Sequence, residues 1–248
     1  GCRHGAKNTL DKNYLWLARK QGLELHADTE VTAVRPLPGG GYRVEAKHGR
    51  HPLWRRRRVF TAQQVVLAGG VLGTVDLLAK MKRDPAGLPR LSDKLGSAIR
   101  TNSESLIGVV TPSRDVDYSK GVAIGSIFQI DESSHLEPVR YPAGSGAFRT
   151  MLAPHVAGEN VAVRFVRMIG TVLRHPIATL RAVFVRDLAK QSAILLYMRT
   201  ADGTLRLRRR PWGLGSRREE GPAPTASIPE ATELANAFAQ KMGGTPFS

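Results

Sequence analysis

The 248 residues, 42% of them hydrophobic, are enough for one large domain or two smaller ones with a substantial core. The sequence contains neither a run of about 18 uninterrupted apolar residues nor a signal-peptide pattern at its start, so it offers no membrane-spanning segment. Cys2 is the single cysteine, which excludes an internal disulfide framework and a thiolate metal cluster and favours a reducing compartment.

A formal net charge of +16 would attract the chain to nucleic acid or to an anionic membrane surface. The positive charge is concentrated in two runs, Arg55 to Arg58 and Arg206 to Arg210, with Arg217 and Arg218 after the second run. Neither run is interleaved with aromatic residues or lies beside a nucleic-acid-binding motif. We therefore expect both runs to occupy solvated loops, and we do not expect nucleic acid as a partner.

The first third of the chain predicts a helix followed by a small β-meander. Asn8 and Thr9 are candidate N-caps, Asp11 is favoured in the first helical turn, and Gly22 closes the helix in a left-handed conformation. Partial alternation of apolar and polar residues, with turn residues between 36 and 41, then predicts strands over residues 23–34, 42–46 and 58–60. This assignment leaves the first arginine run in a hairpin loop.

The stretch from Thr61 to Leu78 combines the features of a buried strand, a glycine turn and a helix. Its residues from Val65 to Leu67 form a short apolar run typical of a strand that is buried on both faces. Gly69 and Gly70 permit a tight turn, after which leucines follow at helical spacing. The N–H groups at such a helix start can face a nucleotide, but many α/β proteins use the same turn only as a connection.

Beyond Met81 the sequence becomes loop-like, and the polar block from Thr101 to Ser105 indicates a domain boundary near Thr101. The second region predicts a largely antiparallel sheet accompanied by helices. We expect strands over residues 121–128 and 135–141, followed by helices over 161–169 and 177–190 that are separated at His175 and Pro176. Strands over 191–198 and 204–207 should form a hairpin around Asp202 and Gly203. A linker over 213–227 then leads to a last helix over 230–242, with Leu234, Phe238 and Met242 on its apolar face. The first strand of the hairpin is almost wholly apolar and should lie inside a sheet.

Other chemical motifs are missing from the sequence. His48 and His51 lie three positions apart in a loop context, which is a weak basis for a metal site, and we expect none. The sequence has neither a Gly-x-Ser-x-Gly elbow nor a Walker loop, and it has no internal repeat.

Five blocks of the sequence carry a resemblance: Gly1 to Leu15, Val65 to Thr74, Leu88 to Ser92, Arg100 to Ser105 and His135 to Tyr141. In this order they resemble the cholesterol oxidase branch of the glucose-methanol-choline oxidoreductases, particularly its mycobacterial type, whereas residues 151–192 are the least diagnostic. The resemblance implies an α/β fold with α+β character. Residues 1–101 would be part of a Rossmann-like FAD-binding domain with a β-meander insertion, and residues 102–248 part of an antiparallel-sheet substrate-binding domain.

The family resemblance implies an enzyme that oxidises the 3-hydroxyl group of a sterol, passes the hydride to FAD and delivers the electrons to molecular oxygen or another acceptor. Many members also isomerise the double bond of the product. By this resemblance Val31 lies where the family's backbone hydrogen-bonds the adenine, although ordinary strand core would also explain it. Ala68, Gly69 and Gly70 match the turn beside the ADP portion of FAD, where a side chain would hold the cofactor off.

The resemblance also implies two residues near the reacting atoms. Glu137 aligns, with one gap, with the family's carboxylate that moves a proton during isomerisation. Burial in an apolar sterol pocket would raise the pKa of such a carboxylate, which suits a general base near neutral pH. The alternative is a surface carboxylate paired with Arg140, and Pro138 departs from some relatives. Asn102 falls where the family places polar residues near the flavin, although a structural turn would also explain it.

Two parts of the family pattern are missing from the sequence. The Gly-x-Gly-x-x-Gly fingerprint is expected before Gly1, and the histidine and asparagine that activate the substrate hydroxyl are expected after Ser248. We therefore expect the chain to be a central fragment that is inactive on its own, from a protein in the cytoplasm or peripherally at a membrane.

Two other functions stay open at this stage. One is a related flavoenzyme that acts on another alcohol, or a dehydrogenase with an acceptor other than oxygen. The other is a basic module that binds nucleic acid or acidic lipid through the two arginine runs, and a steep weakening of nucleic-acid binding with salt would identify it. The same runs would help a sterol oxidase to approach a sterol-bearing membrane.

Overall fold

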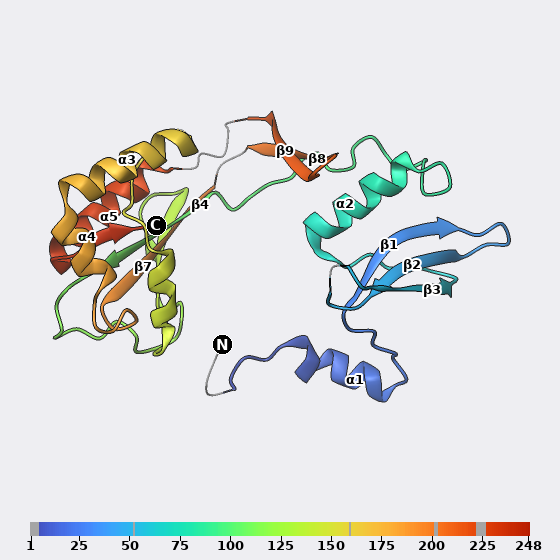
Figure 1. Cartoon of the computed structure of the whole chain (residues 1–248), viewed down its shortest axis with the longest axis horizontal. Helices are drawn as coiled ribbons and strands as arrows, with labels where there is room; N and C mark the ends of the chain where they lie inside the picture. Colours follow the sequence, from blue (N-terminus) through green and yellow to red (C-terminus); the bar gives the residue numbers. More distant parts are fainter. Residues whose placement is uncertain (1–4, 52, 159, 201–202, 222–226) are drawn as a thin grey trace. The chain divides into compact units, whose positions relative to one another are not determined.

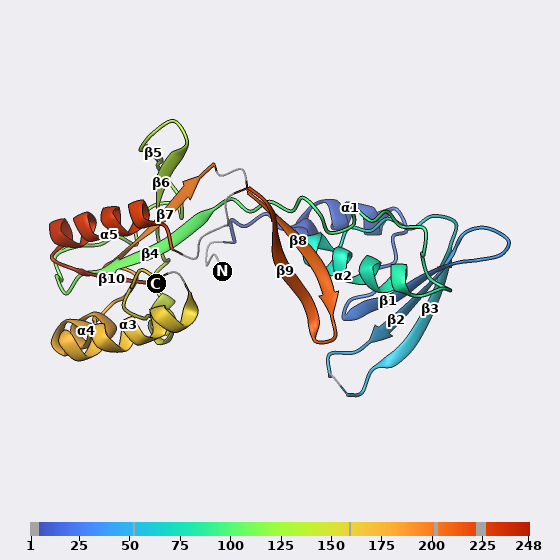
Figure 2. The same cartoon turned by 90° about the horizontal axis from the view of Figure 1, so that it is seen from above.

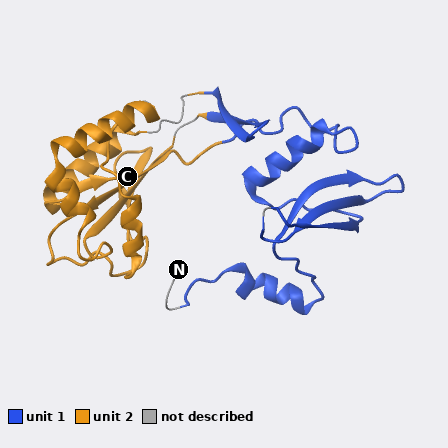
Figure 3. Ribbon diagram, viewed as in Figure 1, with its two compact units in different colours: residues 1–99, 204–220 blue, residues 100–203, 221–248 orange. Residues whose placement is uncertain are grey.

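The structure is a computed structural model that describes residues 5–51, 53–158, 160–200, 203–221 and 227–248 (Figure 1). The chain divides into two compact units, which Figure 3 shows in different colours. The first unit comprises residues 1–99 and 204–220, and the second comprises residues 100–203 and 221–248. The assignment of these parts to cofactor binding and substrate binding stays a prediction.

The first unit combines a three-stranded antiparallel sheet, a hairpin and two α-helices. Its elements are η1 (Leu10–Lys12), α1 (Tyr14–Lys20), β1 (Thr29–Pro36), β2 (Tyr42–His48), β3 (Arg56–Ala62), α2 (Gly70–Arg83), β8 (Thr204–Arg210) and β9 (Gly213–Glu220). The sheet has the order β1-β2-β3, and β8 pairs with β9. The β-meander that the sequence predicts is therefore present.

Helix α1 begins later than its sequence signals indicate. The 3₁₀ helix η1 occupies the expected first turn. Helix α1 starts at Tyr14, whose backbone N–H donates a hydrogen bond to the side-chain oxygen of Asn13. The predicted end is confirmed, because Gly22 has a φ of +93° and the N–H of Leu23 donates to the carbonyl of Ala18 at 3.0 Å. Thr9 precedes η1 as a cap residue would, but its side chain makes no capping hydrogen bond, and Asn13 instead precedes α1.

The first arginine run corrects the expectation of a loop. Arg56, Arg57 and Arg58 lie in β3, opposite His48, Lys47 and Ala46 of β2, and the connecting loop ends before them. β3 is an edge strand of the sheet, and these arginines are exposed. Charged side chains are well tolerated on an exposed edge, where they also discourage pairing with other chains.

The expected strand from Val65 to Leu67 does not form. Residues 64–68 have no regular structure, and among the described residues none forms a ladder with them. Val66 is 89% exposed. A strand needs neighbours for its backbone N–H and C=O groups, and the described residues place none beside this segment.

The expected hairpin between residues 191–198 and 204–207 is also wrong. β7 (Ser192–Arg199) pairs with β4 (Glu104–Val110) and β6 (Ser134–Val139). β8 pairs instead with β9, from Arg210 opposite Gly213 to Thr204 opposite Glu220. The predicted linker is therefore strand over 213–220, and the second arginine run lies in β8. Residue 202 of the predicted turn and residues 222–226 of the predicted linker lie outside the described residues.

The second unit is a five-stranded antiparallel sheet with helices on its two faces. Its elements are β4 (Glu104–Val110), β5 (Phe128–Gln129), β6 (Ser134–Val139), η2 (Ser145–Met151), α3 (Val161–Arg174), α4 (Pro176–Val183), β7, α5 (Pro229–Met242) and β10 (Thr245–Phe247). The order is β10-β4-β7-β6-β5, so the apolar strand β7 lies inside the sheet as predicted. The break at His175 and Pro176 is confirmed, but α4 ends at Val183, and the strand expected over 121–128 is reduced to β5.

Figure 2 shows α5 on one face of this sheet and α3 and α4 on the other. Ala231, Ala235 and Ala239 are the buried residues of α5, and they pack against Ile107, Leu136 and Leu195 of the sheet. Leu234 and Met242 only support this cluster, and Phe238 is 36% exposed, so the buried stripe differs from the predicted one. Small alanine side chains let the helix backbone approach the sheet closely.

Both units thus combine helices with antiparallel sheet, which confirms the α/β and α+β class. All strand pairs among the described residues are antiparallel. The parallel sheet of a complete Rossmann-like domain is not formed by them.

Candidate functional site

Three of the four residues predicted to bind a cofactor line one pocket of the first unit. The pocket has a volume of about 540 Å³ and is bounded by β1, the segment 65–69, α2 and Arg209. Val31, Ala68 and Gly69 are among its lining residues. Gly70 is not, but it starts α2 with a φ of +74°, a conformation that favours glycine.

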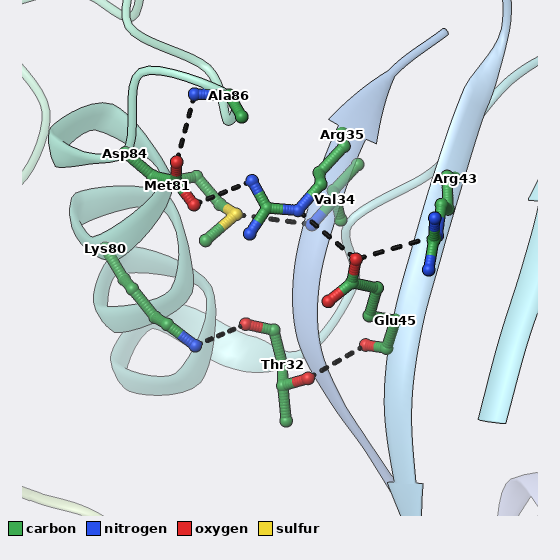
Figure 4. Close-up of polar contacts among 9 residues, drawn as sticks. All are labelled: Thr32, Val34, Arg35, Arg43, Glu45, Lys80, Met81, Asp84 and Ala86. Carbon is green, nitrogen blue, oxygen red and sulfur yellow. Dashed lines mark hydrogen bonds and ion pairs between the residues drawn. The ribbon is translucent and has the colours of Figure 1, made fainter. Parts of the chain in front are cut away.

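Helix α2 is held against β1 by polar contacts on one side of this pocket (Figure 4). The ammonium group of Lys80 donates to the carbonyl of Thr32 at 2.7 Å, and the backbone N–H of Val34 donates to the Met81 sulfur at 3.3 Å. The register between β1 and β2 shifts between Val31 and Ala33, which leaves the intervening backbone free of the ladder and able to accept this lysine.

The end of α2 is fixed by an ion pair. Arg35 Nη1 contacts Asp84 Oδ2 at 2.7 Å, and the Asp84 carboxylate also accepts a hydrogen bond from the backbone N–H of Ala86 at 3.0 Å. The hydrogen bond from Arg35 lowers the pKa of Asp84 below its ordinary value of 3.8. Arg35 Nε also contacts Glu45 Oε1 at 3.2 Å, so this arginine joins α2 to both β1 and β2.

The pocket carries one unsatisfied acceptor. Asp76 of α2 accepts from the guanidinium of Arg209 through Oδ2, whereas its Oδ1 is buried with no hydrogen-bond partner among the described residues. Both residues line the pocket. A ligand with an N–H or O–H group would therefore find an acceptor here that the folded chain has already desolvated.

The glycines of the pocket leave room for a ligand. A Cβ added at Gly69 would meet only the hydroxyl of Thr74 at 3.6 Å, an ordinary contact, and one added at Gly73 would meet nothing within 4 Å. Gly69 has a φ of −83°, which any residue adopts. The chain itself therefore does not require glycine at position 69, whereas close approach of a nucleotide would. This space fits the predicted ADP portion of FAD.

The two predicted catalytic residues lie on one face of the sheet in the second unit. Leu106 of β4, Leu196 of β7 and Glu137 of β6 stand directly opposite one another, and directly opposite residues of antiparallel strands share a face. Asn102 joins the same face just before β4, where its amide contacts the sulfur of Met198, the residue opposite both Glu104 and His135.

This face is apolar and partly open. Leu106 is 50% exposed, and Glu137 keeps 20% of its side chain exposed. Helix α5 covers the opposite face, where Ile107, Leu195 and Tyr197 are buried. Leu196 lies between Leu106 and Glu137 in the sheet, and Asn102 precedes β4 on the same face. The two polar residues therefore border an apolar part of this face.

Local contacts can be compared with the two structural alternatives, which were pairing of Glu137 with Arg140 and a structural turn at Asn102. Glu137 Oε1 lies 3.7 Å from Nε2 of His135, whereas the Arg140 guanidinium donates to the carbonyl of Val122 at 3.3 Å. Asn102 also donates to the carboxylate of Glu104, as a structural role would have it. The roles of Asn102 and Glu137 stay predictions.

Sequence reasoning missed His135, Asp76 and Arg209. His135 stands two positions before Glu137, so the period of a strand would have placed it on the same face. Asp76 and Arg209 are 133 residues apart, and no local pattern signals their contact.

His48 and His51 make separate contacts with other residues. His48 Nδ1 lies 3.0 Å from the Thr29 hydroxyl, and His51 Nδ1 accepts from the N–H of Leu53 at 3.3 Å. Within the described parts of the chain, no three His, Cys, Asp or Glu side chains are grouped as metal ligands.

Comparison with known proteins shows which proteins this chain is similar to. No protein-family model matches it. It is 36% identical over 257 residues to a protein named cholesterol oxidase from Acinetobacter baumannii, covering 100% of this chain and 46% of that protein. Cholesterol oxidases from two strains of Mycobacterium tuberculosis are 36% identical over 255 residues, covering 98% of this chain and 44% of those proteins.

The fold and these relatives are consistent with part of an α/β oxidoreductase. The 36% identity over the whole chain supports the resemblance of its five sequence blocks to the cholesterol oxidase branch of the glucose-methanol-choline oxidoreductases. The chain spans about half the length of the curated relatives it matches.

Proposed function

We propose that this chain is the part of an FAD-dependent sterol oxidase that closes around the adenine end of the cofactor and contributes one wall of the sterol site. The observation that carries the proposal is the pocket in which Val31, Ala68 and Gly69 meet, with open space where Gly69 and Gly73 lack side chains. Its volume of about 540 Å³ suits a nucleotide portion, since ligand pockets measure roughly 300 to 1,000 Å³.

FAD, when bound, would accept the hydride that leaves the carbon of the sterol 3-hydroxyl group. The residues of this chain would bind and orient. Val31 would lie against the adenine, and Ala68, Gly69 and Gly70 would allow the ADP portion to approach the backbone. Asp76 Oδ1 would accept a hydrogen bond from the bound nucleotide, because this buried oxygen otherwise lacks a donor.

The second unit would supply the proton transfer of a double-bond isomerisation. Glu137 would take a proton from one carbon of the oxidised steroid and return it to another, while Leu106 and Leu196 would exclude water from the ring system. His135, 3.7 Å from the Glu137 carboxylate, would hold that carboxylate in position. Asn102 would orient polar groups of the substrate or cofactor at the border of the same surface.

The test uses the complete oxidase that contains this chain, with cholesterol as substrate and separate measurement of oxidised and isomerised steroid. Glu137→Gln should preserve oxidation and slow isomerisation by about 100-fold or more, the usual contribution of a positioned acid–base group. Glu132→Gln, an exposed neighbour outside the sheet face, is the matched control and should change neither step. Equal loss of both steps in Glu137→Gln would reject the role of this residue.

The substrate class and the acceptor are tested with the same enzyme. Turnover of 3-hydroxysterols with oxygen uptake would support a sterol oxidase. Turnover of smaller alcohols only, or reduction of an artificial acceptor without oxygen uptake, would replace the proposal with the related alcohol oxidoreductase or dehydrogenase.

A further inference from the structure

The two helices α3 and α4 present an apolar surface that no described residue covers. On α3, Phe165, Ile169 and Leu173 follow at spacings of four and are 58%, 43% and 74% exposed. Val166 adjoins them and is also exposed. Residues at such spacing form one stripe along a helix. None of the side chains of α3 is fully buried, although nine of its fourteen residues are Val, Ile, Leu, Met, Phe or Ala.

The side of α3 that faces the unit carries both polar and apolar residues. Arg164, Met168, Thr171 and Val172 are half-buried and follow at spacings of three and four. The guanidinium of Arg167 donates to the carbonyl of Ala157 at 2.7 Å. The stripe of Phe165, Ile169 and Leu173 is nevertheless exposed, unlike the apolar face of a helix that packs in a protein core.

Helix α4 continues the exposed surface after the break at Pro176. Ala182 is buried, and with Val185 it packs against Val110 and Phe247 of the sheet, so this side anchors the helix. Ile177, Leu180 and Phe184 lie at spacings of three and four and are 65%, 56% and 73% exposed. We call the exposed apolar residues of α3 and α4 the helical apolar surface.

A basic pocket adjoins this surface. It has a volume of about 420 Å³, and Arg114, Arg181 and Arg186 line it beside Leu180 and Phe184. A phosphate group bound by these arginines would thus sit next to exposed apolar side chains. This pairing of a cationic site with an apolar surface matches the two parts of a phospholipid, its headgroup and its acyl chains.

The charge of the whole segment is of one sign. Residues 160–186 contain five arginines and no acidic residue. Among the described helices, none has the length and apolar character needed to cross a bilayer. A helix with arginines on one side and large apolar side chains on the other instead lies in the plane of a membrane interface.

We propose that α3 and α4 form a membrane-binding surface that inserts Phe165, Ile169, Leu173 and Phe184 into the interface of a bilayer containing anionic phospholipid. The arginines of the same segment bind the phosphate groups. This surface is separate from the arginine runs of β3 and β8, and it does not depend on catalysis, because the partner is the lipid and not the sterol.

The experiment measures flotation of the full chain with sterol-free vesicles of phosphatidylcholine alone and of phosphatidylcholine mixed with phosphatidylglycerol. The chain should float with the mixed vesicles, and salt should weaken the binding because part of it is electrostatic. The double variant Phe165→Ser with Leu173→Ser should weaken binding by about tenfold or more, because each buried apolar side chain contributes strongly to insertion. Arg174→Glu with Arg181→Glu should weaken binding to mixed vesicles by about tenfold or more, because Arg181 lines the basic pocket.

One double variant is the matched control. Val122→Ser with Ile127→Ser removes exposed apolar side chains elsewhere in the second unit. It should float like the unchanged chain. Circular dichroism should show that every variant keeps its fold, which the exposure of the altered side chains leads us to expect.

A spectroscopic readout separates insertion from surface attraction. Cys2 is the single cysteine, so Ile169→Cys in a Cys2→Ser background accepts one polarity-sensitive fluorophore. Its emission should shift to the blue on mixed vesicles, in this chain and in the complete oxidase. No flotation, equal flotation of the Phe165 and Leu173 double variant, or no shift in the complete oxidase would overturn the proposal. The last result would show that further protein covers this surface.

Discussion

Arg35 on β1 reaches Asp84, the residue that follows α2, with 2.7 Å between Nη1 and Oδ2. Because the same guanidinium contacts Glu45 on β2 at 3.2 Å, one side chain joins the helix to two strands. The pocket of the first unit lies between β1 and α2, so this contact helps to set its width. The candidate cofactor site therefore depends on a polar contact outside its own lining.

Replacement of Asp84 by Asn should make the first unit less stable in a pH-dependent manner. Arg35 lowers the pKa of Asp84 below its ordinary value of 3.8, so the ionised form is favoured in the folded chain. Its stabilising effect is complete above the ordinary pKa and is lost as the pH falls through the lower, folded pKa. Urea unfolding at several pH values should show a difference between the variant and the unchanged chain that shrinks below about pH 4. A difference that is constant with pH would contradict this account, and Asp115→Asn, at an exposed position, is the control.

Met81→Ala should destabilise the first unit by about 2–5 kcal/mol, the usual cost of truncating a buried methionine. Met81 has 0% exposure, and its sulfur accepts the N–H of Val34, so both packing and a hydrogen bond are lost. Leu72→Ala on the same helix, where the side chain is 66% exposed, should change stability little. Denaturant unfolding measures both, and equal effects would show that α2 does not pack on β1 through Met81.

Asp131 should control the acid stability of the turn between β5 and β6. Its carboxylate accepts hydrogen bonds from the hydroxyls of Ser134 and Ser133 and from the backbone N–H of Ser133, which lower its pKa to about 2. The stabilisation is present above its ordinary pKa of 3.8 and is lost as the pH falls toward 2. Asp131→Asn should lower the melting temperature near neutral pH and have less effect near pH 2. NMR titration of the Asp131 carboxyl carbon checks the pKa directly, and a midpoint close to 3.8 would contradict the assignment.

Local patterns predicted much of the fold. The meander of β1 to β3, the break before α4 and the left-handed Gly22 all follow from residues close in sequence. Pairing between distant strands could not be predicted in this way. β7 and β8 are separated by a turn-like Asp-Gly pair, yet β8 pairs with β9 in the other unit, because a strand's partner depends on available edges and not on the nearest turn signal.

In the candidate site, too, local features could be predicted from sequence, whereas contacts between distant residues could not. The glycine turn and Val31 could be singled out from sequence and family resemblance, and the structure brings Val31, Ala68 and Gly69 to one pocket. The contribution of Arg209 could not be predicted from sequence, because this residue reaches Asp76 from a hairpin near the other end of the sequence. The strand expected at Val65 finds no pairing partner among the residues that the structure describes, which no local propensity can reveal.

The flavin content of the complete oxidase tests the central claim most directly. A bulky side chain at Ala68 would fill the pocket, so Ala68→Trp should reduce the bound flavin per protein by about tenfold or more, whereas the unchanged protein should be purified with its flavin. Ala86→Trp, at an exposed position outside this pocket, should keep the flavin. Absorbance of the purified proteins, corrected for protein concentration, gives the result. Full flavin content in Ala68→Trp, or no flavin in the unchanged protein, would contradict the proposal that this pocket holds the adenine end of FAD.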